Sequence, residues 1–356
     1  PEAVKEAIKR ILDEKDPMFV HGYMDNSGYE DVRQAVADNL NHRFDTHFDF
    51  HNIIMTVGAA GGLNIIFKTI LDPGDEVLVF APYFGEYNSY AANFDAKTVA
   101  VHPDPETFQP DLGDFAAKFT EKTKAVIINT PNNPTGVVYS DATLKAIADI
   151  LKEKQKAYKK EIYLVSDEPY RELVYDGQKE NFLTKYYENT IVGYSFSKSL
   201  SLPGERIGYV VVPNEVADAD TVIAGINVSN RTLGFVNAPS LIQLAVAECL
   251  EEKTDVAYYD KNRTRLYEAL TGYGYTCIKP EGAFYMWVKS PDEDEDRFVE
   301  QAKKYHLILV KGGAFCWPGY VRIAYCVSYD TIERSLPAFE KLAELQAFEV
   351  YRPDIS

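Results

Sequence analysis

The sequence predicts an α/β protein with two domains. Its 356 residues suggest, as a prior, two domains with ample material for a core. Seven short apolar segments, each followed by turn residues or a helical pattern, are typical of strands buried on both faces of a parallel or mixed sheet. From about residue 239 a long helical pattern precedes further strands and helices, which predicts a second, smaller α+β domain.

Strands and helices are expected to alternate through the first domain. The predicted strands are residues 53–56, 76–80, 97–101, 125–129, 162–166, 191–195 and 207–212. Residues 31–44 and 141–158 carry their apolar side chains along one stripe, which predicts amphipathic helices between the strands. This alternation favours an α/β sheet with right-handed crossovers.

We expect a large domain at residues 24–238 and a small domain formed by residues 1–23 together with 239–356. One long helix at about residues 239–270 would connect the two domains. Residues 1–16 form a charged amphipathic pattern that is unlike a secretory signal. This amino-terminal helix is expected to pack with the carboxy-terminal part of the chain.

Composition excludes several classes of function. Lys and Arg number 37 against 54 Asp and Glu, so the net charge of 37 − 54 = −17 argues against nucleic acid or an anionic membrane as a partner. The net charge does not argue against a small anionic substrate, because one buried cavity can be basic on an acidic protein. No apolar run approaches the roughly 20 residues of a membrane span. Four cysteines without CxxC spacing favour a reducing, cytoplasmic setting.

No metal site is expected. His47 and His51 are four residues apart, but Phe48 and Phe50 lie beside them and a predicted strand follows. A solvated or capping role therefore fits these histidines better than metal coordination, which needs a supporting cluster of ligands.

Lys198 is the first candidate for chemistry. It follows the apolar segment 191–195, among small hydroxyl residues and eight positions before Arg206. Strand ends in such sheets face the crevice that holds ligands. A partly desolvated lysine near other cations has a lowered pKa, so its free amine can attack a carbonyl. Taken alone, a surface lysine after a strand remains the simpler interpretation.

Asp167 ends another apolar segment and would project into the same crevice. A buried carboxylate needs a cationic or donor partner, and a protonated heteroaromatic nitrogen would serve. Tyr170 follows three residues later, within reach of the same ligand. The alternative is an aspartate that caps the following helix or turn.

Two turns complete the constellation. Residues 131–136, PNNPTG, form a Pro- and Asn-rich turn after an apolar strand, which would hold Asn133 with little conformational freedom. At residues 58–61 a glycine-rich turn separates a strand from a helix, where exposed backbone N–H groups could bind a phosphate. That second signal is weak alone, since it does not fit the GxGxxG fingerprint of dinucleotide sites.

Together these motifs indicate a single ligand. It would carry a phosphate for residues 58–61, Ser195 and Arg206, and a ring nitrogen for Asp167. It would also carry a phenolic oxygen for Asn133 and Tyr170, and an aldehyde for Lys198. Pyridoxal phosphate has all four groups.

The chain resembles the class I/II aminotransferases, fold-type I pyridoxal phosphate enzymes similar to aspartate aminotransferase. The resemblance runs over nearly the whole chain and rests on SFSK at 195–198, GERIG at 204–208, PNNPTG at 131–136 and SDEPY at 166–170. It implies a large α/β/α domain with a mostly parallel, mixed seven-stranded sheet and a smaller α+β domain. In the phosphate turn, Gly-Ala-Ala stands where many relatives carry hydroxyl side chains.

The resemblance implies the following catalytic roles. Lys198 would hold the cofactor as an aldimine and then move a proton between the substrate α-carbon and the cofactor. Asp167 would keep the pyridine nitrogen protonated, so that the ring withdraws electrons. Asn133 and Tyr170 would form hydrogen bonds to the phenolic oxygen.

The resemblance also implies phosphate contacts from the backbone of Ala59 and Ala60 and from the side chains of Ser195, Ser197 and Arg206, whose planar fork suits phosphate.

Three further residues match family positions, and a fourth lies close to one. Phe84 would stack on the pyridine ring. Arg322 would bind the substrate α-carboxylate, and Asn133 would also contact the substrate. Tyr23 would reach the phosphate in the partner subunit, which implies a homodimer with shared active sites. Family members that act on dicarboxylic amino acids use a second arginine to bind the side-chain carboxylate, and Arg231 lies one residue out of register with it. Arg231 would therefore either bind that carboxylate or have a role at the surface or near the phosphate.

The expected function is a pyridoxal phosphate-dependent aminotransferase that exchanges an amino group between an L-amino acid and a 2-oxo acid in a ping-pong cycle. A β-lyase acting on carbon–sulfur bonds, or an amino-acid decarboxylase, would use the same scaffold. A cofactor-binding regulator is disfavoured, because the chain lacks a DNA-binding module and carries a charge of −17. The amino donor cannot be named from the sequence.

Overall fold

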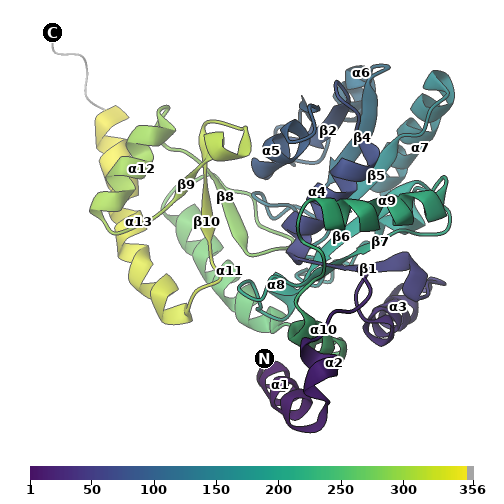
Figure 1. The fold of residues 1–356 in the computed structure, drawn as a ribbon. Coiled ribbons are helices and arrows are strands. Elements are labelled where there is room, and N and C mark those ends of the chain that lie inside the picture. The colour runs from purple at the N-terminus through teal and green to yellow at the C-terminus, as the bar shows by residue number, and fades with distance from the viewer. Residues whose placement is uncertain (351–356) are drawn as a thin grey trace.

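A computed structural model describes residues 1–350 of the chain, with side chains through residue 345. Two β-sheets organise it (Figure 1). The larger sheet has seven strands in the order β1-β7-β6-β5-β4-β2-β3, and the smaller has three in the order β8-β10-β9. The predicted α/β class with a mixed seven-stranded sheet is therefore confirmed.

Every strand predicted for the large sheet is present, with each end within two residues of its expected position. The strands are β1 (Ile53–Thr56), β2 (Glu76–Phe80), β3 (Lys97–Val101), β4 (Thr123–Ile128), β5 (Tyr163–Asp167), β6 (Thr190–Ser195) and β7 (Gly208–Val211). Strands β3, β2, β4, β5 and β6 run parallel, whereas β7 is antiparallel to both β6 and β1. Both faces are covered, so these strands are nearly continuously apolar.

Helices cover the two faces of this sheet. On one face α4 (Gly58–Ile70), α5 (Glu86–Ala92) and α9 (Ala219–Thr232) share an apolar core with the strands. The other face is covered by α3 (Glu30–Phe44), α6 (Leu112–Lys118) and α7 (Asp141–Tyr158). The short elements are α2 (Pro17–His21), α8 (Phe196–Ser199), η1 (Phe50–Asn52) and η2 (Leu183–Lys185). The structure thus has three layers, helix, sheet and helix.

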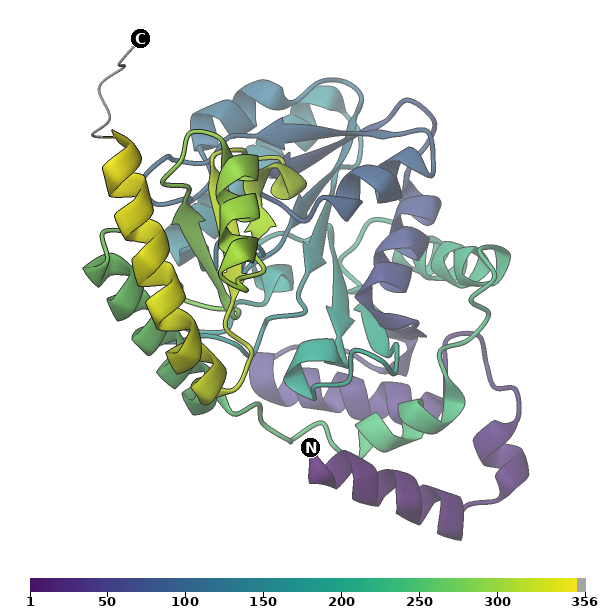
Figure 2. The same cartoon turned by 90° about the vertical axis from the view of Figure 1, so that its left-hand side faces the viewer.

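The carboxy-terminal part has a core of its own. The antiparallel strands β8 (Tyr285–Lys289), β10 (Tyr320–Ala324) and β9 (Val310–Lys311) form the small sheet, with η3 (Gly312–Phe315) next to it. Helices α11 (Val256–Gly272), α12 (Glu295–Lys304) and α13 (Tyr329–Val350) pack beside this sheet, and α11 and α13 lie side by side (Figure 2).

The prediction of a single long helix at residues 239–270 is wrong. The structure has two helices there, α10 (Ser240–Ala247) and α11, separated by the non-helical residues 248–255. The hydrophobic periodicity continues across this break, but Asp255 accepts a hydrogen bond from the backbone of Tyr258 and begins a new helix.

The amino-terminal helix is present as α1 (Glu2–Glu14), which buries Val4, Ala7 and Ile11. It packs against α10, so it contacts the first helix of the carboxy-terminal part rather than the small sheet. The domain boundaries inferred from the sequence stay a prediction. Within the described residues, no helix combines the length and apolar character that a membrane crossing requires.

Candidate active site

A cavity of about 350 Å³ lies where the carboxyl ends of β4, β5 and β6 meet the start of α4 and the edge of the small sheet. Ligands bind at this end of the strands in open α/β sheets. The lining residues come from both parts of the chain: Ala59, Ala60, Leu63, Phe84, Tyr87, Tyr90, Asn129, Asn133, Asp167, Pro169, Tyr170, Ser195, Ser197, Lys198, Pro203, Arg206, Tyr285 and Arg322.

Lys198 enters the cavity from α8, the single helical turn that follows β6. Burial lowers the pKa of its ammonium group, and the charges of Arg322 and Arg206 lower it further, against an opposite effect of Cys326. Nζ lies 5.4 Å from the centroid of the Phe284 ring. The environment therefore favours a free amine, the nucleophilic and proton-accepting form.

Asp167 is the last residue of β5 and is buried. One carboxylate oxygen, Oδ2, accepts a hydrogen bond of 2.6 Å from the hydroxyl of Tyr87 on α5. The other, Oδ1, is buried and has no partner within the described residues. Burial raises the pKa of this carboxyl to about 7, aided by the charge of Glu168 and opposed by the Tyr87 hydrogen bond. A cationic ligand group at Oδ1 would restore the ionised form.

The residues expected to bind the phosphate through their backbone lie at the start of α4. Ala59 and Ala60 lie in its first turn, where backbone N–H groups have no partner inside the helix. Gly58 has φ +67°, and a Cβ there would lie 2.8 Å from the Arg206 guanidinium. Glycine therefore lets Arg206 approach the turn closely. Ser197 and Ser195 lie opposite, with their hydroxyl oxygens 2.6 Å apart.

Asn133 and Arg322 meet across the two sheets. Arg322 Nη1 donates a hydrogen bond of 2.8 Å to Asn133 Oδ1. Asn133 is held in turn by its backbone N–H, which donates to Asn129 Oδ1 at 2.7 Å. Asn129 Nδ2 donates to the Asp167 carbonyl at 2.9 Å. The PNNPTG turn is thereby tied to the end of β5.

The structure brings nearly all of the predicted site residues into this one cavity. Phe84 and Tyr170 line it as well. Two predicted residues are not among the lining residues: Tyr23 is 95% exposed, and Arg231 is exposed on α9. Their predicted roles stay predictions. Within residues 1–350, no group of three or more histidine, cysteine or acidic side chains is arranged to hold a metal ion.

Seven lining residues escaped the sequence reasoning, and three of them, Tyr87, Asn129 and Tyr285, make hydrogen bonds to other site residues. Tyr87 lies only three residues after Phe84, at the start of α5, but its sequence position did not reveal its contact with Asp167. Asn129 and Tyr285 carried no signal in the sequence. Their contacts depend on a neighbouring strand end and on the small sheet, which only the tertiary structure brings near.

The residues fit pyridoxal phosphate. Among the described lining residues Arg206 and Arg322 are cationic, Lys198 carries a basic amine and Asp167 is the one carboxylate, so this cavity of a strongly acidic protein is basic. Such a balance suits a phosphate together with a substrate carboxylate. The Oδ1 of Asp167, which has no hydrogen-bond partner in the described residues, suits a protonated ring nitrogen, and the lowered pKa of Lys198 suits an aldehyde partner.

Comparison with known proteins agrees with the geometry. Residues 1–339 match the model of the family "Aminotransferase class I and II". An aspartate aminotransferase of Pyrococcus horikoshii is 31% identical over 97% of this chain and 88% of its own length. A probable N-acetyl-LL-diaminopimelate aminotransferase of Bacillus subtilis is 33% identical over 96% of this chain and 85% of its own.

A crystal structure of an aminotransferase from Eubacterium rectale superimposes with a TM-score of 0.95 at 45% identity, covering 97% of this chain and 87% of that one. The fold, the composition of the cavity and the match across most of the sequence lead to the same conclusion. This chain belongs to the class I and II aminotransferases, which are pyridoxal phosphate-dependent enzymes.

Proposed function

We propose that this aminotransferase works at the cavity around Lys198, with Lys198 as proton carrier, Asp167 as partner of the cofactor ring and Arg322 as reader of the substrate α-carboxylate. The observation that carries the proposal is that one cavity holds a half-buried amine whose pKa is lowered, a half-buried arginine, and a buried carboxylate with one oxygen that has no hydrogen-bond partner in the described residues. The substrates are L-amino acids and 2-oxo acids, exchanged in two half-reactions.

Each residue has a defined task in this scheme. Bound pyridoxal phosphate supplies an aldehyde and an electron-withdrawing ring that stabilises negative charge at the substrate α-carbon. Arg322 orients the amino acid through its carboxylate. The free amine of Lys198 takes the proton from the α-carbon and delivers it to the cofactor side. Asp167 keeps the ring nitrogen protonated, while Tyr170 and Asn133 hold the phenolic oxygen.

The phosphate anchors the cofactor. Backbone N–H groups of Ala59 and Ala60 would donate to it, and Ser195, Ser197 and Arg206 would add side-chain donors. Phe84 would support the face of the ring. Because most of these groups are already held by the fold, little ordering is needed on binding.

For the amino donor, the named relatives favour substrates with a second acidic group, such as aspartate. Among the described lining residues the cations are already assigned, so Arg231 would have to reach the substrate from a partner subunit. An Arg231→Ala variant that loses activity with aspartate but keeps it with alanine would support this role. Equal losses with both amino acids would contradict it.

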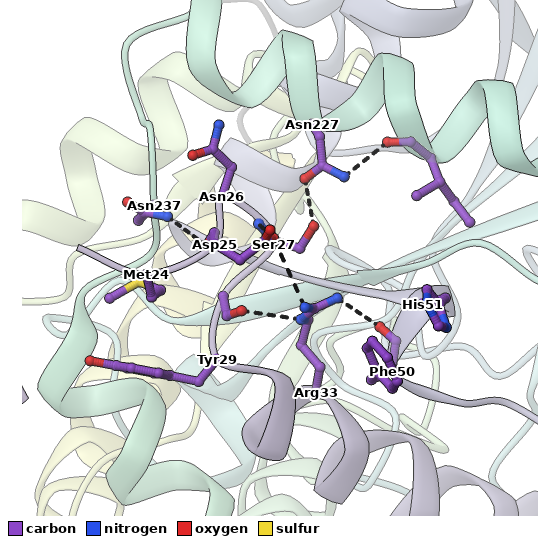
Figure 3. Close-up of polar contacts among 12 residues, drawn as sticks. Met24, Asp25, Asn26, Ser27, Tyr29, Arg33, Phe50, His51, Asn227 and Asn237 are labelled. Carbon is purple, nitrogen blue, oxygen red and sulfur yellow. Dashed lines mark hydrogen bonds and ion pairs between the residues drawn. The ribbon is translucent and has the colours of Figure 1, made fainter. Parts of the chain in front are cut away.

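We propose a homodimer in which Tyr23 reaches the partner's phosphate site. Tyr23 is 95% exposed, as expected for a side chain that awaits a partner. Its loop is held firmly, as Figure 3 shows: Asn237 Nδ2 donates to the Asp25 carbonyl at 2.8 Å, and the Ser27 hydroxyl donates to Asn227 Oδ1 at 2.7 Å. Arg33 Nε also donates to the Gly28 carbonyl at 3.2 Å.

Four exposed apolar side chains lie nearby in the sequence: Met18 and Phe19 precede Tyr23, and Leu233 and Val236 lie between Asn227 and Asn237. They would be covered in the dimer. We also propose a cytoplasmic location, which agrees with four free cysteines in the described residues.

The decisive experiment mixes the purified holoenzyme with single amino acids and no acceptor. Transamination predicts that the absorption of the bound cofactor changes to that of its amino form while one equivalent of 2-oxo acid appears. Pyruvate and ammonia formed continuously from cysteine, with unchanged cofactor absorption, would favour the β-lyase, and carbon dioxide release would favour a decarboxylase. Lys198→Ala should abolish every one of these reactions, and an unaffected variant would refute the proposed site.

A further inference from the structure

Tyr285 is a lining residue that the scheme above leaves without a task. It is the first residue of β8, is 7% exposed, and faces the cavity. On the paired strand β10, Ala324 lies opposite Tyr285 and Arg322 lies opposite Trp287. Residues two apart on a strand share one face, so Tyr285 and Arg322 are diagonal neighbours on the cavity side of the small sheet.

The ring of Tyr285 supports the Arg322 guanidinium. Arg322 Cζ lies 4.3 Å from the centroid of the Tyr285 ring and 4.7 Å from that of the Phe315 ring. Its Nη1 donates to Asn133, while its Nε is buried without a partner in the described residues. Aromatic faces hold a guanidinium in place without consuming its charge, whereas a carboxylate neighbour would neutralise it. The arginine therefore keeps its charge for an incoming carboxylate.

The hydroxyl of Tyr285 makes a second contact. Its oxygen lies 2.9 Å from the hydroxyl oxygen of Tyr170, and both groups are buried. A phenol has one proton to donate. If Tyr170 donates that proton to the cofactor oxygen, its own oxygen is left to accept, and Tyr285 is the donor in reach. Accepting a hydrogen bond polarises the Tyr170 O–H and makes it a stronger donor.

We propose that Tyr285 is a positioning residue that serves both ends of the active site: its hydroxyl aims the Tyr170 proton at the cofactor, and its ring holds Arg322 ready for the substrate carboxylate. This inference rests on the proposed roles of Tyr170 and Arg322. A single side chain thus couples the cofactor side of the cavity to the substrate side. The two functions reside in different atoms, so different substitutions separate them.

Tyr285→Phe removes the hydroxyl and keeps the ring. The pH titration of the absorption band of the bound cofactor should shift to higher pH, because the phenolic oxygen loses part of its stabilisation. Affinity for 2-methylalanine, which has the α-carboxylate but no α-proton, should stay within about twofold, because the ring still supports Arg322. The turnover number should fall about fivefold, the effect of one hydroxyl hydrogen bond.

Tyr285→Leu removes the ring as well. Affinity for 2-methylalanine, measured from the spectral change of the bound cofactor, should fall about tenfold, the effect of a desolvated cation–π contact. Tyr275→Phe is the matched control, since Tyr275 is buried in the same core and donates a hydrogen bond of 2.8 Å to the Phe339 carbonyl, away from the cavity. It should change neither the spectral titration nor ligand affinity, and thermal melts of all variants establish folding.

An unshifted titration in Tyr285→Phe, or unchanged affinity for 2-methylalanine in folded Tyr285→Leu, would overturn the inference. In either case transamination by the unaltered enzyme and its loss in Lys198→Ala would leave the proposed function standing. Absence of transamination by the unaltered enzyme would instead refute the proposed function itself.

Discussion

Replacing Asp167 with asparagine should have opposite effects on the cofactor-free protein and on the holoenzyme. Without a cationic partner, the buried carboxylate is costly to ionise, so its pKa rises from 3.8 to about 7. Asparagine keeps an oxygen that can accept the Tyr87 hydrogen bond but never carries charge. The variant therefore removes the ionisation cost and little else.

The size and sign of the effect follow from linkage. The interval from 3.8 to about 7 spans about 3 pKa units, equivalent to roughly 4 kcal/mol. Because the folded state has the higher pKa, its carboxyl holds the proton more tightly. Stability from this group is fully present below about pH 4 and is lost as pH rises toward 7. Cofactor-free Asp167→Asn should thus match the unaltered protein below about pH 4, and its stability advantage should grow with pH to about 4 kcal/mol at pH 8.5.

Urea unfolding of both cofactor-free proteins between pH 5 and 8.5 measures this difference, and other titrating groups cancel in it. Asp176→Asn is a matched control: Asp176 is exposed and its pKa is lowered to about 2, chiefly by a hydrogen bond to Arg263, so that difference should be flat above pH 5. With cofactor bound the order should reverse, and Asp167→Asn should bind pyridoxal phosphate more weakly. A flat, pH-independent difference for Asp167→Asn would refute the reasoning.

Three further predictions concern single contacts. Tyr87→Phe removes the 2.6 Å hydrogen bond that lowers the pKa of Asp167, so the fall in unfolding free energy of the cofactor-free protein should continue to a higher pH than in the unaltered protein, and cofactor affinity should drop about tenfold by equilibrium dialysis. Arg322→Lys loses the planar fork, so steady-state kinetics should show KM for both amino acid and 2-oxo acid rising at least about tenfold; unchanged KM values would place carboxylate binding elsewhere. Asn237→Ala loses a hydrogen bond to the Asp25 carbonyl and should weaken the proposed dimer about fivefold in sedimentation equilibrium, whereas an unchanged dissociation constant would show that this anchor is dispensable.

The large sheet was open to prediction because its strands are locally distinctive. Segments such as 76–80 and 97–101 are short, apolar and bounded by turns, and the structure has them as β2 and β3. The long helix at 239–270 failed for the opposite reason. An amphipathic pattern reports which face is apolar, but it does not report a break where a new cap, Asp255, starts the next helix.

Most of the site was predictable because parallel strands present their carboxyl ends at one edge. Asp167 ends β5 and Lys198 follows β6, and their position at the end of apolar runs was enough to place both at that edge. The family resemblance then placed Arg322, which lies on the small sheet and has no local link to the others. Tyr23 and Arg231 lie outside the cavity of their own protomer, so one chain leaves their roles as predictions.

The sequence by itself determined the α/β class, the seven strands and the chemical inventory of the site, because strand periodicity and strand-end residues are local properties. Only the tertiary structure decided which groups touch. The hydrogen bond of Tyr87 to Asp167, and the double contact of Tyr285 with Tyr170 and Arg322, join segments 80, 115 and 37 residues apart. The contacts of Tyr285 depend on how the two sheets meet, whereas the contact of Tyr87 depends on how α5 packs on the large sheet. The burial that raises the pKa of Asp167 is likewise a product of tertiary packing.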